Sequence, residues 1–240
     1  MLLALLLPAP QGVTTFVRET AAPPGGIAFD ATTVVASSAT SQTACNFTHT
    51  PVGTPTLVLV WIGMKASRTI SVATYGGQAM SLVAVSGSAS AAGDEKMHLY
   101  EKHSPLGGAQ TVNVEFTLDN HYTCIAQSFT GTHASDATVE DDGYDNSGGT
   151  CAAATTTLTM NATSSWMVTA SVWHGADALP IAETGFTARG EGETGGGETS
   201  NDDAYNYGDS TGDTGSLSHI SDAAVTDECG QVSVELIPAA

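Results

Sequence analysis

The sequence predicts an all-β protein: a two-sheet antiparallel sandwich of jelly-roll or lectin-like type with an extended N-terminal arm. Short apolar runs and period-two alternation recur along the chain, and turn residues separate them, with no convincing helix of several turns. Gly, Ala, Ser and Thr are abundant, whereas Lys, Arg, Glu and Leu are too scarce for a mainly helical protein. The 240 residues are sufficient for one large β domain, predicted here as residues 27–240.

The first 26 residues are predicted to form an apolar arm. The leucine-rich start is too short to span a bilayer, which takes about 20 apolar residues, and it lacks the basic region of a secretory signal. Either this segment packs on a partner subunit, or it adds a strand to the parent domain. The candidate assembly residues are Leu2, Leu3, Leu5, Leu6, Leu7, Val13, Phe16 and Val17.

The strands are expected where apolar and β-branched residues run or alternate. Thr56–Gly63 is a continuous apolar run suited to burial on both faces, and Gly76 with Gly77 is expected to turn the chain after Ile70–Tyr75. The remaining predicted strands are Ser81–Val85, Met97–Lys102, Thr111–Leu118, Tyr122–Thr130, Thr155–Met160, Trp166–Trp173, Leu217–Ala224 and Gly230–Ile237.

A weak internal repeat indicates two pseudo-equivalent halves. Cys45–Ile62 is similar to Cys151–Trp173, and Tyr122–Phe129 aligns with Asp227–Val234. The segment 131–149 is then expected to cross from one half to the other. Chance similarity between strands rich in Ser, Thr and Ala is the alternative explanation.

The four cysteines are compatible with two disulfides or with buried free thiols. None lies in a Cys-x-x-Cys pair, so a zinc ribbon or a thioredoxin-like site is not expected. If the repeat holds, pairs across a pseudo-twofold axis would join Cys124 to Cys229 and Cys45 to Cys151.

The net charge of −19 argues against a nucleic-acid partner, because phosphate binding needs clustered Lys and Arg. The charge is also segregated: 17 of the 25 acidic residues follow Ala137, together with a single basic residue, Arg189. Two long, acidic, glycine-rich loops are predicted at about 132–150 and 183–215. They are expected to face solvent, away from an attachment side formed by the N-terminal end.

No motif for catalysis, a metal or a cofactor is convincing. The segment 190–195 fits the dinucleotide fingerprint G-x-G-x-x-G literally, but it follows no buried strand and places two carboxylates where pyrophosphate would lie. The seven histidines have no recognised metal-binding spacing, so we predict no enzyme and no cofactor. Weak calcium candidates, lacking the regular loop spacing, are Asp202, Asp203, Asp209 and Asp213.

Four short motifs resemble a β-sandwich module found in tailed-phage virion proteins and in secreted or surface proteins of bacteria. They are Thr74–Met80 (TYGGQAM), Met97–Tyr100 (MHLY), Gln110–Val114 (QTVNV) and Gln127–Gly131 (QSFTG). The resemblance extends over roughly residues 27–238. It implies a structural, decorating or adhesive role outside the cell, and it carries no catalytic residue.

Two functions are therefore expected as alternatives. The first is a capsid decoration or surface protein on a tailed-phage virion, which contacts other virion proteins and sister subunits through its arm and sandwich edges. The second is a carbohydrate-binding or adhesin module that contacts host-surface glycans, with no membrane partner. Sugar sites commonly use exposed aromatic rings, and the candidates for glycan contact are Tyr205 and Tyr207.

Overall fold

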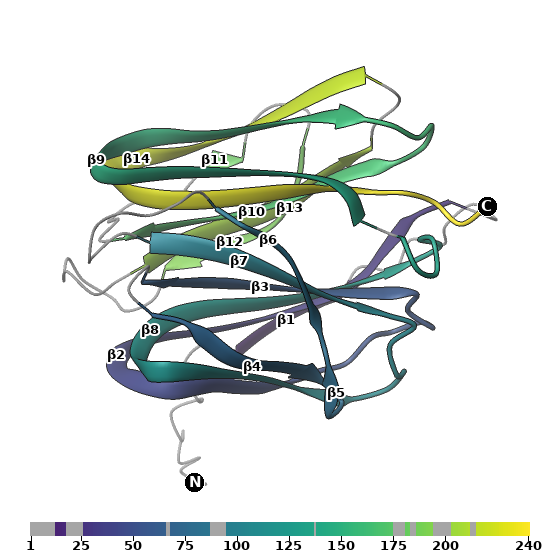
Figure 1. The fold of residues 1–240 in the computed structure, drawn as a ribbon, viewed down its shortest axis with the longest axis horizontal. Helices are drawn as coiled ribbons and strands as arrows, with labels where there is room; N and C mark the ends of the chain where they lie inside the picture. The colour runs from purple at the N-terminus through teal and green to yellow at the C-terminus, as the bar shows by residue number, and fades with distance from the viewer. Residues whose placement is uncertain are drawn as a thin grey trace, which may run out of the picture.

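The predicted all-β antiparallel sandwich is confirmed by a computed structural model of the chain. It describes residues 13–17, 26–65, 68–86, 95–136, 138–174, 181–182, 186–193, 203–211 and 215–240. Every regular element in these ranges is a β-strand, and Figure 1 shows the strands stacked in layers. This part of the chain contains no helix long and apolar enough to cross a membrane.

The described strands form two antiparallel sheets. The first sheet has the order β1-β2-β8-β3-β7-β6, with β4 paired to both β8 and β5. Its strands are β1 (Val13–Val17), β2 (Ala28–His49), β3 (Leu57–Lys65), β4 (Ile70–Tyr75), β5 (Gln78–Ala79), β6 (Ser81–Val85), β7 (Glu95–His103) and β8 (Gln110–Thr130).

The second sheet has the order β11-β14-β10-β13-β12, with β9 paired to β14. Its strands are β9 (Thr138–Met160), β10 (Trp166–His174), β11 (Ile181–Ala182), β12 (Thr187–Glu193), β13 (Asp203–Thr211) and β14 (Gly215–Leu236). Because β8 lies between β2 and β3 just as β14 lies between β9 and β10, the two halves share a topology, as the repeat predicted.

Each half contains a long two-stranded ribbon that folds back on itself. In the β2–β8 ribbon the register shifts between Ser37 and Gln42, and in the β9–β14 ribbon it shifts between Asp222 and Asp227. Register shifts of this kind bend and twist strands. Figure 1 shows both ribbons turning on the same side of the molecule. Each ribbon therefore has two arms that lie in different layers.

Three hydrophobic clusters of described residues fill the spaces between the layers. Leu57, Leu59 and Trp61 of β3 face the central cluster, which also contains residues of β10, β13 and β14. The alternating β3 residues, including Val58 and Val60, face a second cluster within the first half. A smaller third cluster lies within the second half. Burial of the Thr56–Gly63 run on both faces is thus confirmed.

Several predicted boundaries are wrong because polar segments continue the strands. Thr111–Leu118 and Tyr122–Thr130 are parts of one strand, β8, and the last two predicted strands are likewise both part of β14. The predicted acidic loop at 132–150 is mostly β9, and much of the loop at 183–215 forms β12 and β13. The crossover between the halves is correspondingly short, since β9 begins at Thr138.

Candidate functional site

The candidate attachment site is the edge of the first sheet formed by β1. This strand pairs antiparallel with β2, from Val13 opposite Val35 to Val17 opposite Ala31. It ends the strand order, and β2 is its one partner among the described residues. An edge strand of this kind presents a second row of backbone groups to which another chain can add a strand.

The predicted arm boundary at residue 26 needs correction, because five residues of that segment belong to the domain itself. The run Val13–Val17, which consists of β-branched residues and Phe16, is suited to pairing along the edge of β2, as in the alternative of a strand added to the parent domain. Phe16 lies within it, opposite Thr32. The leucines of the predicted arm are outside the described residues; they are Leu2, Leu3, Leu5, Leu6 and Leu7.

The predicted glycan-contact tyrosines belong to strand β13 rather than to an exposed loop. Tyr207 is only 1% exposed and lies in the central cluster, so its prediction as a glycan contact is wrong. Tyr205 is partly buried against the same cluster. Strand alternation puts both rings on one face, where Gly190 and Gly192 of β12 lie opposite them.

The calcium candidate Asp209 is committed to a buried ion pair. Its carboxylate accepts hydrogen bonds from Nε and Nη2 of Arg189, the latter at 2.9 Å, and its side chain is 3% exposed. The prediction of Asp209 as a loop ligand is therefore wrong. Asp202 and Asp213 lie outside the described residues, and of Asp203 only the backbone, at the start of β13, is described. The described residues contain no group of three potential metal ligands.

Arg189 also connects the two halves. Its guanidinium carbon lies 4.5 Å from the ring centroid of Phe29 in β2, a cation–π contact between the sheets. Phe29 in turn packs edge-on against Phe129, with ring centroids 5.9 Å apart. The ion pair of Arg189 with Asp209 and its cation–π contact with Phe29 therefore connect the two halves across the central cluster.

Two further carboxylates stabilise the equivalent turn in each half. Asp30 accepts backbone hydrogen bonds from Val52 at 3.2 Å and Gly53 at 2.8 Å, in the turn between β2 and β3. Glu235 accepts them from Asn161 at 2.9 Å and Ala162 at 3.1 Å, in the turn between β9 and β10. Both carboxylates are buried and are satisfied by these turn amides, which assigns them a structural role.

Three histidines have strongly lowered pKa values: His49 and His219 are buried, and His98 is partly buried. Burial is the main cause that lowers the pKa of His49, His98 and His219 to about 4, so each ring is neutral near pH 7. His49 Nδ1 lies 3.0 Å from the Thr33 hydroxyl, a geometry that a nucleophile and base could share. However, Thr33 is 1% exposed and His49 is 0% exposed, so a substrate cannot reach the pair in the folded protein.

The predicted cysteine pairing across the two halves is wrong. Cys45 and Cys124 are both free and buried, whereas Cys229 is disulfide-bonded. Neither Cys124–Cys229 nor Cys45–Cys151 can therefore be formed here. The physical reason is that Cys124 lies in the cluster internal to the first half, while Cys229 lies in the second sheet opposite Trp173.

Sequence analysis missed Arg189, Asp30 and Glu235 as structural determinants. One signal for Arg189 was present, because a lone cation among 17 acidic residues is expected to have an acidic partner. For the two carboxylates no local motif exists, since each contacts a turn more than 20 residues away in sequence.

Comparisons with protein-family models, with curated proteins and with solved structures find no match to this chain.

Proposed function

We propose that this chain is a non-enzymatic structural protein of the virion surface, a capsid decoration protein of a tailed phage. It attaches through its N-terminal segment and the adjoining edge of the first sheet. The four short motifs described above support the choice of virion, because they resemble a module of such proteins.

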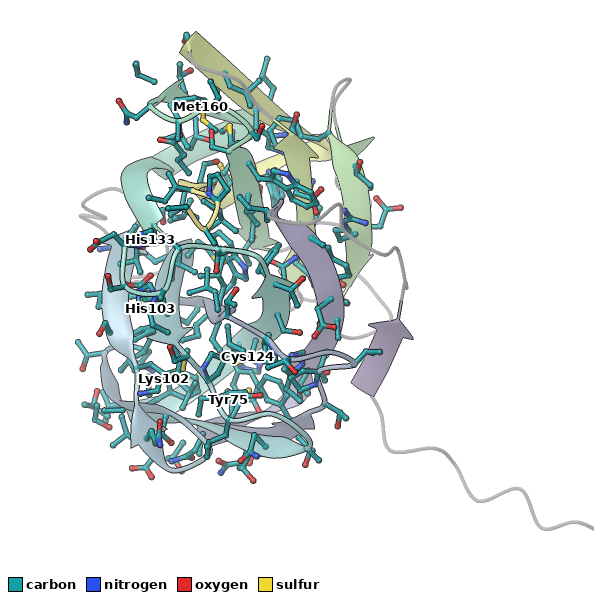
Figure 2. All side chains as sticks on the ribbon, turned by 90° about the vertical axis from the view of Figure 1, so that its right-hand side faces the viewer. Tyr75, Lys102, His103, Cys124, His133 and Met160 are labelled. Carbon is teal, nitrogen blue, oxygen red and sulfur yellow. The ribbon has the colours of Figure 1, made fainter. Side chains whose placement is uncertain are left out.

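The observation that carries the proposal is the position of β1. Backbone pairing along β2 holds this strand at the margin of the sheet, and Figure 2 shows it at the outer edge of the molecule. The leucine-rich start of the chain is covalently joined to that edge. Apolar side chains beside an open strand edge combine two sources of association energy: apolar burial at about 25 cal/mol per Å², and backbone hydrogen bonds.

The distribution of charge gives the attached molecule an orientation. The second half contains 17 acidic residues from position 137 onward, and a particle surface of this kind resists self-association through like-charge repulsion. Five of the six basic residues precede that point, in the half that contains β1. The first half is therefore the side that faces the shell.

Binding to tailed-phage particles purified from the source of this sequence tests the proposal. The full chain is compared with a variant lacking residues 1–12, which keeps β1, and with one lacking residues 1–26, which removes it. We expect saturable binding of the full chain in many copies per particle. The affinity should decrease at least about tenfold on removal of residues 1–12, and further when β1 is also lost.

Two results would overturn the proposal. One is equal binding by the full chain and by a folded variant lacking residues 1–26. The other is an absence of particle binding, together with saturable binding of the free protein to immobilised glycans that Tyr205→Ala abolishes. The second result would favour the adhesin alternative.

A further inference from the structure

The first half contains two buried thiols that do not lie in cross-strand register. Cys45 lies opposite Val114 on one arm of the β2–β8 ribbon, and Cys124 lies opposite Val35 on the other arm. Both are 0% exposed and belong to the cluster enclosed between the two arms. Figure 2 labels Cys124 in this half of the molecule, near Tyr75.

The two thiols meet across that interior. The side chains of Cys45 and Cys124 are hydrogen-bonded to one another, and the Tyr122 side chain is hydrogen-bonded to Cys45. The fold-back of the ribbon produces this proximity, because the two cysteines are 79 residues apart in sequence. A cross-link here would join two layers of the sandwich.

The second half already contains a disulfide at the corresponding place. Cys229 lies in β14 opposite Trp173 of β10, as Cys124 lies in β8 opposite Ile62 of β3. Cys229 is disulfide-bonded. The position that is reduced in one half is therefore oxidised in the other, although the strand order around both is the same.

We propose that Cys45 and Cys124 are a second disulfide site, oxidised by a small-molecule disulfide while the chain folds. Two S–H bonds and the S–S bond of the oxidant break, and one protein S–S bond and two small-molecule thiols form. The two electrons and two protons of the cysteine thiols pass to the oxidant, so no other reactant is needed.

Oxidation is expected during folding because the folded protein protects the pair. Burial is the main cause that raises the pKa of Cys124 well above its ordinary value, which keeps the thiol protonated. The thiolate is the attacking species in disulfide exchange, and the oxidant has no access to a fully buried sulfur.

Refolding of the full chain tests the site. The protein is reduced and unfolded, refolded in a mixture of oxidised and reduced glutathione, alkylated under denaturing conditions, and digested without reduction for mass spectrometry. We expect no alkylated cysteine and a linked peptide pair containing Cys45 and Cys124. Alkylation of both Cys45 and Cys124, or linkage of either one to Cys151 or Cys229, would overturn the proposal.

A matched variant measures the effect on stability. Cys45→Ala combined with Cys124→Ala keeps the disulfide of Cys229 and removes the proposed one. We expect the oxidised wild-type protein to melt about 5–10 °C above this variant, because the cross-link closes a long loop. When both proteins are instead refolded and kept under reducing conditions, most of that difference should disappear; if it persists, cavity formation in the variant explains it and the stabilising role is refuted. Should the variant not fold, the peptide map alone decides whether the bond forms.

Discussion

The two halves of the molecule have the same strand order but fill their own interiors with different chemistry. The space between the arms of the β2–β8 ribbon is lined by apolar side chains such as Val60, Ile62 and Val114. Between the arms of the β9–β14 ribbon, a ladder of hydrogen bonds takes much of that place. Gln231 donates to the Thr156 hydroxyl at 2.7 Å and accepts from the Ser171 hydroxyl at 2.7 Å.

This difference indicates that topology here depends more on ribbon bends and turns than on the identity of the core. Both ribbons bend at a register shift, and in both halves a buried carboxylate stabilises the turn that leads to the next strand. Among the described side chains, the second half has a smaller apolar cluster within its own arms, and it adds the hydrogen-bonded ladder and the disulfide at Cys229.

Acidification is expected to lower the free energy of unfolding more than any other change considered. Most of this loss should come from the first half, because it contains His49 and His98, whereas the second half contains His219. Burial lowers each pKa to about 4, although Asp30 partly opposes this for His49 and Lys96 adds to it for His98. The unfolded chain binds protons near pH 6.5 and the folded protein only near 4. Stability therefore falls as pH decreases through this window, on the order of 3 kcal/mol per histidine.

Urea unfolding at several pH values between 7.5 and 4 measures this dependence. His49→Gln and His98→Gln together should flatten the profile more than His219→Gln does. A free energy of unfolding that is constant between pH 6.5 and 4 would contradict the prediction, and a greater flattening by His219→Gln would reverse the assignment to the first half.

Breaking the contact between the halves is expected to have the next largest effect. Arg189→Ala leaves the buried carboxylate of Asp209 without its bidentate partner and removes the cation over Phe29. Loss of one member of a buried ion pair costs about 3–5 kcal/mol, measurable by urea unfolding. The control is Arg189→Met with Asp209→Leu, which should recover most of the loss. Equal destabilisation by the single and double changes would show that packing, not charge, is responsible.

Where the sequence pattern is apolar and local, it predicts the fold well. The run at Thr56–Gly63 predicts β3, and Gly76 and Gly77 predict the turn after β4, where both adopt positive φ angles of 56° and 74°. Polar bends within a strand have the same sequence pattern as chain breaks. Asp119 and Asn120 separate two predicted strands, yet both lie within β8, because the ribbon continues through its bend.

The candidate site was less predictable because its residues meet through long-range pairing. Tyr207 lies in a segment rich in Gly and Asp, which is typical of an exposed loop. Pairing of β13 with β10 instead places its side chain in the central cluster. Asp209 is buried because Arg189 lies on the neighbouring strand. The pairing of β1 is predictable only as one of two alternatives, because a five-residue run of β-branched and aromatic residues does not indicate which edge it will join.

Replacing one buried glutamine in each half compares hydrogen bonds in the interior of the second half with one that faces the central cluster from the first half. Gln231→Leu removes hydrogen bonds to the Thr156 and Ser171 hydroxyls and to the His219 carbonyl, and should cost about 1–3 kcal/mol. Gln127→Leu in the first half removes one side-chain bond, that from Trp61 Nε1 at 2.6 Å, and should cost less. Chemical denaturation of both variants decides; a larger loss for Gln127→Leu would contradict the view that hydrogen bonds stabilise chiefly the second half.

The smallest effects are expected at the two glycines that allow tyrosine rings to lie across β12. A Cβ at Gly190 would overlap the hydroxyl of Tyr207, and one at Gly192 would overlap that of Tyr205. Tyr207 is enclosed in the core, so Gly190→Ala should cost about 1–3 kcal/mol. Tyr205 is only partly buried, and its ring can shift towards solvent, so Gly192→Ala should cost under about 1 kcal/mol.

Thermal unfolding of the two alanine variants tests this order. Equal costs would mean that overlap with a tyrosine ring alone, and not the burial of that ring, determines how much stability is lost. The reverse order would contradict the packing of β12 on β13. In the first half β6 lies at the corresponding edge beside β7 and has no glycine, so this close approach of backbone and ring is a property of the second half.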